Sequence, residues 1–109
     1  MKALHCAIKQ QYLDLIQTGT KNVEYRDMSP YWMERLVEIP AGKDISQHRA
    51  DIISGKVEPK FKKYTHIVFH CAGTVVTVPI VDIRTYRGHR LFAIALDNKD
   101  NTVKKQAKK

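Results

Sequence analysis

Apolar residues fall into short runs along the first part of the chain, and the period of these runs changes near residue 10. Residues 3–8 are mostly apolar, which predicts a short strand. Over residues 10–18 the spacing becomes helical, and Gly19 is suited to end the helix because it tolerates a left-handed backbone. The predicted inner face of this helix consists of Tyr12, Leu15 and Ile16.

The next segment contains a strand and a helix start signal. Residues 22–26 predict a strand, with Glu24 and Arg26 on the same face because side chains alternate along a strand. Ser29-Pro30 combines a favoured N-cap residue with the residue favoured at the first helical position. A short helix or turn is therefore expected over residues 31–37.

The polar segment 43–63 fits two interpretations. Ser46 is placed to cap a small helix that carries Ile52 and Ile53 on one side. A flexible excursion is the alternative, and long inserts of that kind often overhang a binding site.

The second half of the chain is rich in Val, Ile, Phe and Thr, which predicts β-structure. Gly73 and Gly88 mark bends between strands, and Pro79 predicts an edge strand or a bulge. The expected strands are residues 65–71, 74–83 and 91–96. Together with the helices, they predict a small barrel-like α+β domain, with a flat two-layer sheet as the alternative.

Length and composition restrict the class of protein. A chain of 109 residues fits one domain, here expected over residues 1–98. With 43% hydrophobic and 28% charged residues it has globular composition, and no apolar run is long enough for a membrane helix. Two cysteines are too few for a disulfide scaffold, so a reducing cytoplasmic location is expected. No nucleotide-cofactor motif is present, and we expect no cofactor.

The charge is strongly basic, with 19 Lys and Arg against 11 Asp and Glu, a net charge of +8. Residues 99–109 hold five lysines and one aspartate, which predicts a disordered basic tail. Such a tail acts either as a solubilising segment or as an anchor for nucleic-acid phosphates.

Cations, a carboxylate and aromatic rings gather between residues 21 and 35. Arg and Lys pair with phosphate, aromatic rings stack on bases, and a carboxylate accepts from an exocyclic amine. The candidates are Lys21, Glu24, Arg26, Tyr31, Trp32 and Arg35. The competing interpretation is structural: Tyr25 and Trp32 are core residues, and Glu24 pairs with Arg26 at the surface.

Two other groups of residues carry candidate chemistry. Arg87, His89 and Arg90 surround a glycine, which suits phosphate contacts as well as a solvated loop. His5-Cys6 and His70-Cys71 are repeated dipeptides on predicted strands. Adjacent residues in a strand point to opposite faces, so we expect buried cysteines and no metal site.

Residues 12–26 read YLDLIQTGTKNVEYR: a short helix, a glycine, a lysine, and a strand with Glu24 and Arg26. Pro30-Tyr31-Trp32 and Arg35 follow, and the apolar strand 91–96 comes late in the chain. This pattern resembles the ASCH family (activating signal cointegrator homology). The quoted stretch covers about a quarter of the chain, and the strand order extends the similarity over most of the remainder.

The resemblance implies a PUA-like β-barrel with short helices flanking a cleft, a fold class that binds RNA or reads modified bases. One ASCH branch removes the acetyl group of N4-acetylcytidine with a Lys, a Thr three residues later and a distant Glu. Lys21 matches the Lys, Glu24 stands in place of the Thr, and residues 84–90 offer no carboxylate for the third position. Another branch of the same family, which this chain also resembles, cuts RNA.

These inferences favour a binding module for RNA or a modified nucleoside, with no membrane partner. The expected ligand-binding residues are Lys21, Glu24, Arg26, Tyr31, Trp32, Arg35, Arg87, His89 and Arg90. The alternative is a small hydrolase of acylated nucleosides, or an RNA-cleaving enzyme, with Lys21 and Glu24 as catalytic residues. A third possibility is a domain that binds only another protein. The sequence makes no prediction of oligomeric state.

Overall fold

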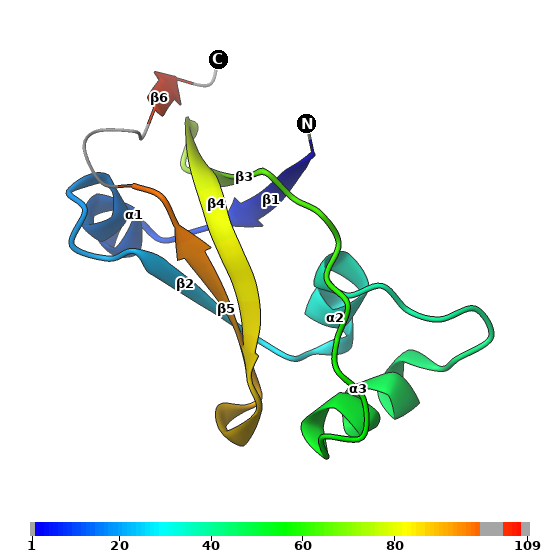
Figure 1. Cartoon of the computed structure of the whole chain (residues 1–109). Coiled ribbons are helices and arrows are strands. Elements are labelled where there is room, and N and C mark those ends of the chain that lie inside the picture. Colours follow the sequence, from blue (N-terminus) through cyan, green and yellow to red (C-terminus); the bar gives the residue numbers. More distant parts are fainter. Residues whose placement is uncertain (1, 99–103, 108–109) are drawn as a thin grey trace. The chain divides into compact units, whose positions relative to one another are not determined.

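The computed structural model describes residues 2–98 and the backbone of residues 104–107. The elements alternate between strands and helices in the first half of the chain and are almost all strands in the second half (Figure 1). In chain order they are β1 (Ala3–Ala7), α1 (Gln10–Gln17), β2 (Val23–Asp27), α2 (Pro30–Leu36), α3 (Ile45–Ile53), β3 (His66–Cys71), β4 (Thr74–Tyr86), the 3₁₀ turn η1 (Arg87–His89), β5 (Leu91–Leu96) and β6 (Lys104–Ala107).

The strands form one mixed sheet in the order β1-β3-β4-β5-β2, with β6 also paired to β4. β1 is parallel to β3, whereas β3 and β6 are antiparallel to β4. The predicted α+β class is confirmed. The predicted small barrel is wrong, because the pairing order ends at β1 and β2 and the sheet stays open. Hydrophobic patterning identifies strands but does not specify whether the two end strands pair with each other.

Contacts along the chain group into two units. Unit 1 contains Met1–Glu24, Lys63–Asp82 and Ile94–Lys109, and unit 2 contains Tyr25–Lys62 and Ile83–Ala93. The single domain expected over residues 1–98 stays a prediction. The predicted disordered tail falls partly on residues 99–103 and 108–109, which lie outside the described residues, and the backbone of residues 104–107 forms β6.

In unit 1, α1 packs against one face of the β1–β3 pair, and Cys71 donates to Gln10 at 3.4 Å. The helix is confirmed, but its inner face differs from the prediction. Leu13 and Ile16 are fully buried, whereas Tyr12 is 42% exposed and Leu15 is 41% exposed. Leu13 and Ile16 are three residues apart and form the centre of the buried stripe of this short helix, and Tyr12 lies at the edge of that stripe.

Pro79 lies within β4, which is neither an edge strand nor bulged at this position. It pairs in register with His66 of β3, and its carbonyl accepts from the backbone N–H of Asp97 at 2.9 Å. In a strand the N–H and C=O of one residue point to the same side. The missing N–H of Pro79 therefore faces the point where β5 ends at Leu96, so the absent donor falls at the end of that strand pairing.

In unit 2, α2 begins as predicted, because the Ser29 Oγ accepts from the backbone N–H of Trp32 at 3.3 Å. Segment 43–63 contains the helix α3 rather than a wholly flexible excursion, and α3 lies next to α2 (Figure 1). Its cap is Asp44, which accepts from the backbone N–H of Gln47 at 3.2 Å, so the predicted Ser46 cap is wrong. Both residue types cap well, and the helix starts two residues earlier than a Ser46 cap would place it.

Asp51 of α3 is the centre of a polar cluster in unit 2. The ammonium of Lys43 donates to Asp51 at 2.5 Å and the amide of Gln47 donates at 2.9 Å. These two hydrogen bonds, the first above all, hold the pKa of Asp51 below its ordinary value of 3.8. The cluster ties the loop before α3 to the helix.

The helices within the described residues are all too short and too polar to cross a lipid bilayer.

Candidate nucleic-acid interface

The predicted site residues are divided between the two units. Lys21 and Glu24 belong to unit 1, and the other candidates belong to unit 2. Those in unit 2 are Arg26, Tyr31, Trp32, Arg35, Arg87, His89 and Arg90. The chemistry of each unit therefore follows from its own geometry.

Lys21 and Glu24 form an ion pair in unit 1. The Nζ of Lys21 is 2.6 Å from the Oε1 of Glu24 and 5.1 Å from the ring centroid of Tyr12. Lys21 lies in the turn before β2, where Asn98 Nδ2 donates to its carbonyl at 2.7 Å. The Glu24 side chain is 7% exposed and that of Lys21 is 25% exposed. An acid and a base are thus in direct contact in unit 1, with the base partly exposed to solvent.

Arginines stack on aromatic rings around α2 in unit 2. The Cζ of Arg26 is 5.1 Å from the ring centroid of Trp32, and that of Arg35 is 4.3 Å from the centroid of Tyr31. The structural interpretation holds for Trp32, which is 8% exposed, and fails for Tyr25, which is 45% exposed. Tyr31, at 54% exposure, keeps ring surface open to solvent beside Arg35.

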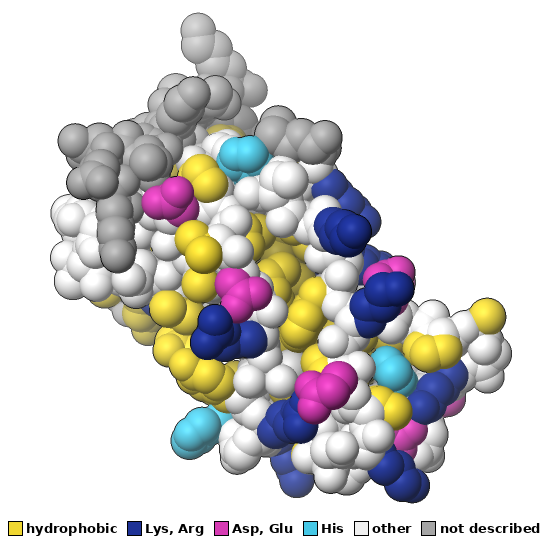
Figure 2. All heavy atoms as spheres, viewed as in Figure 1, with side chains coloured by type: hydrophobic (Ala, Val, Ile, Leu, Met, Phe, Trp, Pro, Cys, Tyr) yellow, Lys and Arg dark blue, Asp and Glu magenta, His cyan; other side chains and the backbone are white. Residues whose placement is uncertain are grey.

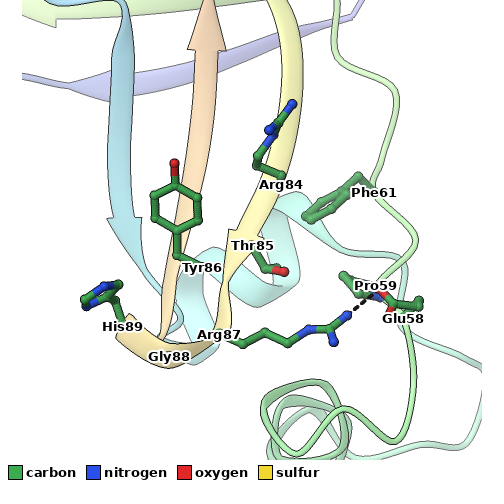
Figure 3. A pocket seen from close by; sticks show the side chains of 9 residues that line it. All are labelled: Glu58, Pro59, Phe61, Arg84, Thr85, Tyr86, Arg87, Gly88 and His89. Atoms are coloured by element: carbon green, nitrogen blue, oxygen red, sulfur yellow. Dashed lines mark hydrogen bonds and ion pairs between the residues drawn. The ribbon is translucent and has the colours of Figure 1, made fainter.

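A pocket of about 610 Å³ lies at the end of β4 in unit 2 (Figure 3). Arg87 extends from this end toward Glu58, with which it forms an ion pair. The residues that line this pocket are Glu58, Pro59, Phe61, Arg84, Thr85, Tyr86, Arg87, Gly88 and His89. The pocket therefore combines two guanidinium groups with aromatic side chains.

Exposed aromatic side chains surround the same strand end. The ring centroids of Tyr25 and Tyr86 are 5.8 Å apart, and those of Tyr86 and His89 are 6.5 Å apart. Partial burial raises the pKa of the Tyr25 phenol, and the neighbouring Tyr86 raises it further. Tyr25 is therefore a neutral phenol at physiological pH, and its ring presents an uncharged face.

His89 also lines a second pocket of unit 2, of about 390 Å³. Its other lining residues are Asp27, Met28, Ser29, Pro30, Ser46, Arg49, Arg90 and Leu91. Gly88 lies in the bend between β4 and β5, as predicted, and the positive φ of this bend, +54°, is on Arg90. A left-handed backbone at a non-glycine residue costs about 1–3 kcal/mol, and such strain concentrates at functional sites.

All six arginines of the chain lie in unit 2, whereas unit 1 carries its positive charge on lysines. On the face shown in Figure 2, basic side chains are interspersed with acidic ones. Sequence reasoning did not select Arg49, Arg84, Glu58 or Phe61 as site residues. For Arg84 the sequence held a signal, because residues two apart on a strand share a face and Arg84 is two residues from Tyr86. In the structure both side chains are exposed.

Three of the predicted site residues line one or both of the two pockets, namely Arg87, His89 and Arg90. The other predicted residues of unit 2 line neither pocket: Arg26, Tyr31, Trp32 and Arg35. Comparison of the chain with protein-family models, curated proteins and solved structures found no match.

Proposed function

We propose that this chain is an RNA-binding module of the ASCH, PUA-like type, and that unit 2 holds single-stranded RNA or a modified nucleoside within it. The observation that carries the proposal is the concentration of all six arginines in the unit that presents exposed Tyr25, Tyr31 and Tyr86. Guanidinium groups pair with phosphate oxygens in a bidentate manner, and aromatic faces stack on unpaired bases.

The pocket at the end of β4 supplies both kinds of contact. Arg84 and Arg87 line it together with Tyr86. The phosphates that flank a base stacked on Tyr86 would lie at the end of β4, near the guanidinium groups of Arg84 and Arg87. Because bases of every sequence have an aromatic face, this arrangement favours single strands over duplexes and has weak sequence preference.

Hydrolysis of an acylated nucleoside is the second candidate function. It is favoured by one observation, the 2.6 Å contact between Lys21 and the largely buried Glu24. An acid and a base in contact are the parts that proton transfer in amide hydrolysis requires. In this ion pair the Glu24 carboxylate would accept a proton from the attacking water, and the Lys21 ammonium would donate one to the leaving amine.

RNA binding is tested by titrating a fluorescently labelled single-stranded RNA with the full chain at several salt concentrations. The variant Arg84→Gln/Arg87→Gln removes two cations from the pocket, and Lys2→Gln/Lys9→Gln removes two exposed cations from unit 1 as the matched control. Loss of two phosphate contacts is expected to reduce the slope of log K against log salt by about 1.4. Equal effects of both double variants would contradict a site in unit 2.

Hydrolysis is tested by incubating the protein with N4-acetylcytidine and following cytidine release. Release that disappears in both Lys21→Ala and Glu24→Gln, with unchanged circular dichroism, would support the second candidate. Release that persists in both variants would show that Lys21 and Glu24 are not catalytic residues.

A further inference from the structure

Two histidines of unit 1 meet on one face of the β1–β3 pair. The Nδ1 of His5 is 2.9 Å from the Nε2 of His70, and the ring centroids are 5.1 Å apart. In the parallel register His5 pairs with Val68 and Ala7 pairs with His70, so the two histidines are diagonal neighbours on the same face. The cysteines that follow each of them are buried on the opposite face.

The separation of the two ring nitrogens matches the bite of a metal chelate. Zinc–imidazole bonds are about 2.0–2.1 Å long, so two such bonds at a right angle place their nitrogens about 2.9 Å apart. At the tetrahedral angle the same bonds give about 3.3 Å. The observed separation of the nitrogens therefore matches square-planar or octahedral coordination, and a tetrahedral ion after a small opening, once each ring turns its lone pair from the other nitrogen toward the ion.

Packing on the opposite face of the β1–β3 pair fixes the backbone positions of the two histidines. Leu4 and Cys6 of β1, with Ile67 and Phe69 of β3, are buried there, and the backbone N–H of Ile8 donates to the His70 carbonyl at 3.1 Å. The positions of the two rings on the backbone are therefore fixed before any ion binds. His5 belongs to the exposed side chains, and His70 is partly exposed, so an ion can approach from solvent.

We propose that His5 and His70 form a two-ligand site for a divalent late transition metal, namely Cu²⁺, Ni²⁺ or Zn²⁺. Imidazole is a preferred ligand of these ions, whereas Mg²⁺ and Ca²⁺ prefer oxygen. The ion takes the place of the proton shared between the two nitrogens. That proton moves to the other nitrogen of the same ring, so both metal-facing lone pairs are open and no net proton is released.

The site is bidentate. Among the described residues, no group of three or more His, Cys, Asp or Glu side chains is arranged to hold an ion. The remaining coordination positions are therefore filled by water, which keeps them available to a second molecule. The site lies in unit 1 and does not depend on RNA binding by unit 2.

The test is calorimetric titration of the full chain, free of any histidine tag, with Cu²⁺, Ni²⁺ and Zn²⁺ in turn. The expected result is one ion per chain. Because loss of an outer-shell partner alone typically lowers metal affinity 10–100-fold, His5→Gln and His70→Gln are each expected to weaken binding at least about tenfold.

His66→Gln is the matched control. His66 lies on the same face of the same strand, pairs with Ala3, and its Nδ1 bonds to the Thr65 hydroxyl at 2.9 Å. Its loss is expected to leave metal affinity unchanged. Equal weakening by His66→Gln, or unchanged binding in His5→Gln, would overturn the site.

A measurement on the unaltered chain covers the case in which a variant fails to fold. Electron paramagnetic resonance of the Cu²⁺ complex is expected to show coupling to two imidazole nitrogens. Paramagnetic broadening of amide signals is expected to centre on β1 and β3. Coupling to one nitrogen, or broadening centred elsewhere, would equally refute the proposal.

Discussion

The Nζ of Lys21 lies 2.6 Å from the Oε1 of Glu24, and the carboxylate is the more deeply buried of the two groups. Replacing Lys21 by Met keeps the aliphatic stem but leaves the carboxylate without this cation. Lys21→Met is expected to lower the free energy of unfolding by about 1–3 kcal/mol, because a largely buried carboxylate then loses its hydrogen bond to this cation. Urea denaturation measures this loss.

The same pair permits a sharper test by a double-mutant cycle. Lys21→Met/Glu24→Gln is expected to be more stable than the sum of the single variants indicates, since the buried negative charge is removed together with the cation that stabilises it. Lys9→Met, on the exposed N-cap of α1, serves as the control and is expected to stay within about 0.5 kcal/mol of the parent. Additive effects at Lys21 and Glu24 would show that the contact contributes nothing.

The start of α3 gives a prediction that separates two neighbouring side chains. Asp44 accepts a hydrogen bond from the backbone N–H of Gln47, whereas Ser46 lies inside the helix and is exposed. Asp44→Ala is expected to lower the unfolding free energy by about 1 kcal/mol. Ser46→Ala is expected to change it by less than about 0.5 kcal/mol. Thermal denaturation monitored by circular dichroism distinguishes the two, and the reverse order would restore Ser46 as the cap.

Asp51 predicts a pH-dependent contribution to stability. Its pKa is lowered by the hydrogen bonds from Lys43 and then Gln47, so the folded state binds its proton less readily than the unfolded state. This stabilisation is present above the ordinary pKa of 3.8 and disappears as the pH falls through the lowered value. Asp51→Asn is therefore expected to be less stable than the parent at neutral pH.

Denaturant titrations from pH 7 to pH 2 measure that difference, which is expected to shrink below pH 3.8 as the parent carboxyl becomes neutral. Lys43→Met removes the largest cause of the lowered pKa and is expected to reduce the pH dependence. A constant difference between Asp51→Asn and the parent across the whole range would contradict this account.

Tyr86 and Tyr12 form a matched pair for testing base stacking. Their exposed fractions are 41% and 42%, but Tyr86 lines the pocket of unit 2 and Tyr12 lies in unit 1. Tyr86→Ala is expected to weaken single-stranded RNA binding by about 1–3 kcal/mol, because one base loses its stacking partner. Fluorescence anisotropy measures the affinity. Tyr12→Ala is expected to leave it unchanged, and a larger effect at Tyr12 would move the RNA to unit 1.

Glu58 is expected to compete with phosphate for Arg87. The two side chains form an ion pair, and Glu58 is the far more exposed partner. Because exposed ion pairs contribute at most about 1 kcal/mol, Glu58→Gln is expected to raise RNA affinity by up to about fivefold. Glu38→Gln removes the same charge from an exposed position of unit 2. If both variants raise affinity equally, the gain reflects net charge and not release of Arg87.

The pattern of apolar residues located most elements because apolar positions recur about every 3.6 residues in a helix and every two residues in a strand. The N-cap at Ser29 and the helix end at Gly19, with its φ of +77°, follow from local chemistry that the sequence displays directly. The far end of β4 was predicted to stop at Ile83 but runs to Tyr86. There the exposed residues Arg84 and Tyr86 take part in the strand, and apolar content alone does not detect them.

The candidate site was harder to predict than the fold. Placing Glu24 and Arg26 on one face followed from strand alternation, but the burial of Glu24 depends on Lys21 reaching it from the preceding turn. The pocket of unit 2 joins Phe61 to Arg84, which are 23 residues apart. Such proximity depends on tertiary packing, which leaves no periodic trace in a single sequence.

The pairing of β1 with β3 has a consequence for synthesis of the chain. Ala3 pairs with His66, so β1 must wait for 63 further residues to be made before its partner exists. At about 5–20 residues per second, this delay is about 3–13 s. During that time the side chains of Leu4 and Cys6, which are buried in the folded chain, stay in contact with solvent, and this makes nascent β1 a natural substrate for holding chaperones.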